Sequence, residues 1–207
     1  MADTQVVVAY TDYKSPYAYL AKDLTYELER DCGVRIDWRP YILDIPSYLG
    51  SARVDETGNV LEQDRNAHQW RRVRYSYMDC RREAQKRGLT IRGTQKIWDS
   101  SLAAGGMLYA QRAGDSVFRR YHDAVFERFW KRELDIESVN ALAAVLAEAG
   151  ADGVGFAVEA DALRAEADII SRAAEAKGVF GVPTFVVAGE IFWGREHLPD
   201  IQAMLAA

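Results

Sequence analysis

Cysteine is scarce in this chain of 207 residues, which has only Cys32 and Cys80. The two are far apart in sequence, and neither belongs to a Cys-x-x-Cys pair. Disulfide exchange needs two neighbouring sulfurs, one of them an attacking thiolate of low pKa. A dithiol redox activity is therefore not expected, and both cysteines are interpreted as small, inert core residues.

Other common site patterns are missing as well. The histidines, His68, His122 and His197, show no metal-ligand spacing, and there is no Gly-x-Ser-x-Gly elbow and no Walker or Rossmann glycine pattern. No apolar run reaches about 18 residues, and no charged start precedes an apolar segment. We therefore expect a cytoplasmic protein without a metal site, a membrane span or a secretory signal.

The composition is that of a globular protein with an acidic balance. With 49% hydrophobic residues, the chain can bury one sizeable core, and its length suits a single domain with a large insertion. The net charge of -5 disfavours nucleic acid as a partner. One basic helix face is interpreted as solvated, with contact to an anionic ligand as the alternative; it comprises Arg71, Arg72, Arg74, Arg81, Arg82, Lys86 and Arg87.

Hydrophobic periodicity predicts a chain that is β-α-β at its start and β-β-α at its end. The polar stretch 44–65 lacks periodicity and is interpreted as a functional loop. In the helix predicted at 97–113, Gly105 and Gly106 are expected to weaken the middle. The predicted strands are 5–10, 34–38, 184–187 and 190–192, and the predicted helices are 17–31, 70–88, 97–113, 115–132, 136–149, 161–177 and 195–206.

Several short motifs, in this order, resemble one known family. They are Ser15-Pro16-Tyr17-Ala18-Tyr19-Leu20-Ala21, the spaced Tyr75, Asp79, Arg82 and Ala84, then Gly181-Val182-Pro183-Thr184-Phe185 and Phe192-Trp193-Gly194. The chain resembles the kappa-class glutathione transferases and 2-hydroxychromene-2-carboxylate isomerases, which are related to the DsbA oxidoreductases. The resemblance implies an α/β thioredoxin-like fold with a large all-helical insertion. Residues 1–43 and 178–207 would form the thioredoxin-like domain, and residues 44–177 the insertion.

Ser15 is the candidate catalytic residue. Serine before Pro16 is a favoured helix N-cap, which is a purely structural role. The same geometry stabilises an anion, because free N–H groups and the positive end of the helix dipole face it. The resemblance places Ser15 where thioredoxins have the attacking cysteine, and implies that its hydroxyl activates the thiolate of glutathione.

The resemblance also implies a glutathione site and a substrate site. Val182, before Pro183, would offer main-chain groups to the cysteinyl part of glutathione. Glu196 and His197 stand where the family has Asp and Arg to hold the γ-glutamyl end. The expected glutathione-binding residues are Ser15, Val182, Pro183, Gly194, Arg195, Glu196 and His197, and the expected substrate-binding residues are Asp44, Arg72, Tyr75, Asp79 and Trp98.

The expected function is that of a glutathione-dependent isomerase acting on an aromatic or conjugated carboxylic acid. One alternative is a kappa-like glutathione transferase, which would keep the thioether product. The other is a DsbA-family homologue without a redox cysteine pair. Glutathione and a small-molecule substrate are the expected partners, and the resemblance implies a homodimer.

Overall fold

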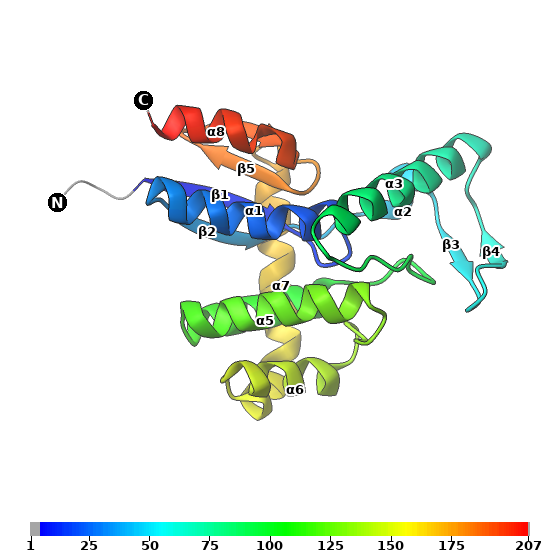
Figure 1. Ribbon diagram of the computed structural model, residues 1–207. Helices are drawn as coiled ribbons and strands as arrows, with labels where there is room; N and C mark the ends of the chain where they lie inside the picture. The colour runs from blue at the N-terminus through cyan, green and yellow to red at the C-terminus, as the bar shows by residue number, and fades with distance from the viewer. Residues whose placement is uncertain (1–4, 207) are drawn as a thin grey trace.

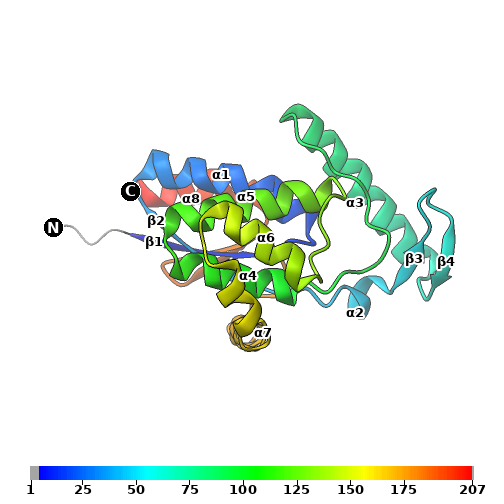
Figure 2. The same ribbon diagram turned by 90° about the horizontal axis from the view of Figure 1, so that it is seen from below.

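The computed structural model describes residues 5–206 and is built on a four-stranded sheet (Figures 1 and 2). The strands β1 (Val6–Thr11), β2 (Arg35–Pro40), β5 (Thr184–Val187) and β6 (Glu190–Trp193) are arranged in the order β2-β1-β5-β6. β1 pairs with β2 in parallel, and the other two pairings are antiparallel. Tyr10 lies opposite Thr184, so the segment that follows β1 lies beside the residues that precede β5.

Helices cover both faces of this sheet, as Figure 2 shows. One face carries α1 (Pro16–Cys32), the 3₁₀ helix η1 (Arg195–His197) and α8 (Leu198–Leu205). The other is covered by α7 (Gly153–Glu175), which contacts β2. The helix α1 begins at a proline and ends before Gly33, whose φ of 65° suits a left-handed C-cap.

The helix α7 also belongs to a bundle with α4 (Ser101–Arg112), α5 (Asp115–Trp130) and α6 (Val139–Ala149). Glycine lets these helices approach closely: a Cβ at Gly106 would lie 2.1 Å from the Tyr121 hydroxyl, and one at Gly153 would lie 2.4 Å from the Ala143 carbonyl oxygen. The expected weakening of α4 is wrong, because its glycines are buried packing positions in a continuous helix. The predicted start of α7 at 161 is also eight residues late.

The remaining elements project to one side and are called the arm (Figure 1). The arm comprises α2 (Ile45–Leu49), β3 (Ala52–Val54), β4 (Val60–Gln63) and α3 (Ala67–Lys86). The loop prediction for 44–65 and the all-helical insertion are both wrong, because β3 and β4 pair as an antiparallel hairpin. Every residue of β4 is exposed, so the strand has no apolar alternation for sequence reasoning to detect.

The thioredoxin-like topology predicted from the resemblance is confirmed. A single hydrophobic core extends from the sheet into the helical bundle, so the proposed domain limits at 43 and 178 stay a prediction. Across residues 5–206, none of the helices combines the length and the hydropathy needed to cross a membrane.

Candidate functional site

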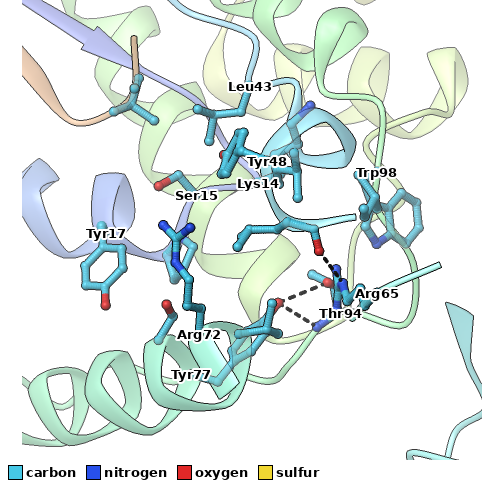
Figure 3. Close-up of a pocket in the computed structure, with 18 of the residues that line it drawn as sticks. Lys14, Ser15, Tyr17, Leu43, Tyr48, Arg65, Arg72, Tyr77, Thr94 and Trp98 are labelled. Atoms are coloured by element: carbon cyan, nitrogen blue, oxygen red, sulfur yellow. Dashed lines mark hydrogen bonds between the residues drawn. The ribbon is translucent and has the colours of Figure 1, made fainter. Parts of the chain in front are cut away.

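A cavity with a volume of about 560 Å³ lies between the sheet and the arm. We call it the main cavity. Its sheet side is formed by the segment after β1, the first turn of α1 and residues 180–182, and its arm side by α2, α3 and residues 94–98. Figure 3 shows side chains from both sides pointing into the same space. The cavity therefore joins parts of the chain that are distant in sequence.

Ser15 occupies the sheet side of the main cavity at the N-terminus of α1. Its Oγ accepts a hydrogen bond from the Ala18 N–H at 3.2 Å, and its own N–H donates to the Asp12 carbonyl at 3.0 Å. Within residues 5–206, the hydroxyl hydrogen of Ser15 has no acceptor. The N-cap role and a donor role can thus coexist, because a hydroxyl accepts and donates at the same time.

A buried acid fixes the segment that carries Ser15. Asp12 accepts hydrogen bonds from the N–H of Lys14 at 3.1 Å and from the N–H of Leu43 at 2.8 Å. The Lys14 ammonium lies 3.8 Å from the same carboxylate and is itself buried. The sequence analysis did not single out Asp12 or Lys14. Two charged residues close to Ser15, after an apolar strand, could have indicated a buried ion pair, because charged side chains are rarely buried unless they are paired.

Val182 lies across from Ser15 at the same cavity. The Val182–Pro183 peptide bond is cis, and the Thr184 hydroxyl donates to the Gly181 carbonyl at 2.7 Å. In the part of the chain that the structure describes, the N–H and C=O of Val182 form no hydrogen bond. These free main-chain groups could pair with an extended peptide, as an added strand does.

The charge of the main cavity is opposite to that of the whole chain. Four cationic side chains, those of Lys14, Arg65, Arg72 and Lys96, line it, and among the described residues no aspartate or glutamate does. Lys96 pairs with Glu137, whereas Arg72 makes no ion pair or hydrogen bond with any described residue. In Figure 3, Arg72 extends from α3 toward Ser15. An anion would therefore find an available guanidinium there.

Aromatic side chains form much of the remaining wall. Tyr17, Tyr48, Trp98 and Trp193 all line the main cavity. Tyr48 is 41% exposed, and partial desolvation and nearby carboxylates raise its pKa to about 12, so its hydroxyl keeps its proton at neutral pH. Such a surface suits a planar, apolar body that carries an anionic group.

Of the expected substrate-binding residues, only Arg72 and Trp98 line the main cavity. Asp44 is exposed just before α2, and Tyr75 is 57% exposed on α3. Asp79 accepts a hydrogen bond from the Tyr17 hydroxyl at 3.4 Å, so it supports a lining residue without lining the cavity itself. Tyr48, Arg65 and Lys96 line it and were missed, because sequence spacing does not show which way the arm faces.

The turn expected to hold the γ-glutamyl end lies close to the sheet side but does not line the cavity. The Gly194 N–H donates to the Pro183 carbonyl at 2.9 Å, which ties the turn to the cis-proline. Arg195 pairs with Glu83 at 3.4 Å and His197 with Asp200 at 3.4 Å, while Glu196 is exposed. Nη1 of Arg195 is buried and has no hydrogen-bond partner among the described residues, so the ion pair with Glu83 satisfies only part of this guanidinium.

Ser15 at a helix N-terminus and Val182, the residue before a cis-proline, line one cavity, whereas Pro183 itself does not. Together with the order of the strands, this arrangement defines a thioredoxin-class protein. The model of the DsbA-like thioredoxin domain matches residues 6–206, and the chain belongs to that family. It is 29% identical to 2-hydroxychromene-2-carboxylate isomerase of Sphingobium xenophagum over 206 residues, covering 98% of each chain.

Solved structures agree with this assignment. A 2-hydroxychromene-2-carboxylate isomerase superimposes with a TM-score of 0.72 at 24% identity, covering 97% of this chain and 94% of the other. The cytosolic disulfide reductase DsbM of Pseudomonas aeruginosa, solved with GSH, gives 0.64 at 20% identity and 97% coverage of both chains. The resemblance to the isomerases is thus confirmed, and the isomerase relatives support an enzyme.

Proposed function

We propose that the protein is a glutathione-dependent isomerase of an aromatic or conjugated carboxylic acid. One observation carries the proposal: Ser15, whose hydroxyl hydrogen is free, and Val182, whose main-chain groups are free, line the same cavity. Among the described residues, cationic side chains line this cavity and no aspartate or glutamate does. The names of the relatives support the reaction class. Thioredoxin-type disulfide chemistry is disfavoured, because the position at the start of α1 carries oxygen instead of sulfur.

The residues present fit the thiol end of glutathione. When bound, glutathione would supply a thiolate that adds reversibly to a conjugated acid. Ser15 would donate its hydroxyl hydrogen to the sulfur and lower its pKa, with help from the N-terminus of α1. Val182 would hold the cysteinyl main chain. The contacts expected for the γ-glutamyl end are weaker, because none of the four residues Gly194, Arg195, Glu196 and His197 lines the main cavity.

Arg72 and the aromatic wall would hold the acid. A guanidinium matches the two oxygens of a carboxylate, and Arg72 has no competing partner among the described residues. Tyr48 and Trp98 would hold the planar body and exclude water. Together these contacts would orient the conjugated bond toward the sulfur beside Ser15.

The test is turnover of 2-hydroxychromene-2-carboxylate, followed by absorbance with and without reduced glutathione. We expect conversion only with the thiol, and mass spectrometry should recover glutathione unchanged after many turnovers. Accumulation of a thioether would instead identify a transferase. No binding of glutathione at millimolar concentration by calorimetry would refute the cofactor.

A further inference from the structure

A second cavity, of about 310 Å³, lies beneath the β3–β4 hairpin. Among the described residues, no acidic side chain lines it, so we call it the basic annex. Its five cationic lining residues are Arg65, Arg74, Arg81, Lys96 and Arg132. It shares part of its wall with the main cavity, so the two spaces adjoin. The shared residues are Arg65, Val73, Tyr77, Thr94, Lys96 and Ile97.

Contacts within the protein neutralise only part of the positive charge of the basic annex. Arg65, Arg81 and Arg132 donate to main-chain carbonyls of neighbouring loops, which positions the loops but neutralises no charge. Of the five cations, only Lys96 is paired with a carboxylate among the described residues. Like charges gathered in one concave space repel each other, and they attract an anion of matching size.

Arg74 is the most available of the five. It makes no ion pair or hydrogen bond with any residue that the structure describes, and its guanidinium lies 5.8 Å from the ring centre of Trp70. Arg74 and Trp70 line the basic annex but not the main cavity. The N–H groups of Arg74 can therefore bind an oxyanion, and the Trp70 indole beside it would report that binding.

We propose that the basic annex is a subsite for a second anionic group, on a ligand whose reacting end occupies the main cavity. The ligand would be a small acid with at least two carboxylate or phosphate groups, one near Arg72 and another near Arg74. The identity of the reacting end rests on the proposed function, whereas the anion subsite does not. Turnover and anion binding are therefore tested separately.

The experiment measures binding of benzene-1,3,5-tricarboxylate, benzoate and inorganic pyrophosphate to the full chain by calorimetry at low salt. We expect the tricarboxylate to bind at least tenfold more tightly than benzoate, with quenching of tryptophan fluorescence. Arg74→Glu should weaken tricarboxylate binding about tenfold and change benzoate binding less than twofold. Pyrophosphate binding more tightly than the tricarboxylate would assign the subsite to phosphate, and the reverse order would assign it to carboxylate.

Arg71→Glu is the matched control, because Arg71 is an exposed residue of the same helix that lines neither cavity. Equal weakening by both charge reversals, or equal affinity for tricarboxylate and benzoate, would overturn the subsite. Thermal unfolding verifies that each variant folds, and Arg74→Gln replaces the charge reversal if that one does not. The proposed function alone fails if this binding pattern holds without any glutathione-dependent turnover.

Discussion

The two sides of the main cavity are built in different ways. On the sheet side, Asp12, Ser15 and Val182 are each less than 10% exposed. Asp12 and Ser15 are held by hydrogen bonds that involve the main chain, and Val182 is held by the pairing of β5, which begins two residues later. On the arm side, Arg72 and Tyr48 are exposed side chains on helices outside the core. Under the proposed function, the core would fix where the sulfur reacts, and the arm would determine which acid is admitted. Changes on the sheet side should alter stability and turnover, and changes on the arm should alter affinity.

Asp12→Ala should have the largest effect on stability. It would leave two main-chain N–H groups and the buried Lys14 ammonium without their partner, which costs about 3 kcal/mol in the free energy of unfolding. Urea unfolding measures this cost. Asp37→Ala is the control, because Asp37 pairs with Arg39 in a half-exposed position and should cost about 1 kcal/mol or less. Equal costs would contradict the supporting role of Asp12.

Ser15→Ala should have the largest effect on turnover. Losing the donor to the sulfur should lower kcat by about 100-fold, and losing the N-cap should cost about 1 kcal/mol of stability. Ser138→Ala is matched to it, because Ser138 caps α6 by accepting from the Ala141 N–H and lies outside both cavities. It should show the stability loss without the kinetic loss. Wild-type turnover in both variants would remove Ser15 from the mechanism.

Arg72→Gln should raise KM for the acid about tenfold and leave kcat within twofold, because the ion pair forms before the reaction begins. The effect should shrink with added salt, since Arg72 is exposed. Steady-state kinetics at two salt concentrations measure it, with Arg71→Gln as the neutral reference. A fall in kcat at constant KM would instead place Arg72 at the reacting atoms.

Cys80→Ala should have the smallest effect of these variants, a change in stability that is seen only at alkaline pH. Burial raises the pKa of Cys80 from an ordinary value of 9.0 to about 12, so the native thiol keeps its proton after the unfolded chain has lost it. The unfolded state is then favoured, and stability should fall, as the pH rises from 9 toward 12. Melting curves of the wild type and Cys80→Ala should diverge over that range. Rapid alkylation of native Cys80 at pH 8 would contradict its inert role.

Sequence reasoning succeeds best where local chemistry marks an element. Pro16 and Gly33 mark the limits of α1, and the β-branched run after Pro183 marks β5. These elements form the sheet side of the site, which is why the resemblance could place Ser15 and Val182 at one cavity. Their chemical roles stay predictions.

The arm was less predictable because its structure depends on contacts outside local patterns. The hairpin is held partly by the Val54 N–H, which donates to the Gln95 carbonyl at 2.8 Å, a contact that no periodicity reports. On α3, Tyr75 and Arg72 are three residues apart, yet only Arg72 lines the cavity. Similarly, α7 begins at Gly153, because the side chain of Asp152 caps the helix by accepting from the Val154 N–H. Gly153 also allows close approach to α6, although glycine disfavours helices on propensity.

The oxygen at position 15 has a consequence for oxidative stress. A peroxide converts an exposed thiolate to sulfenic acid, but a serine hydroxyl has no such fate, and Cys80 is sealed in the core. Cys32 is half-buried and lies outside both cavities, so under the proposed function no thiol of the protein itself takes part in the reaction. Under the proposed function, an oxidised cell would lower the activity by depleting glutathione, and restoring the reduced thiol should restore turnover.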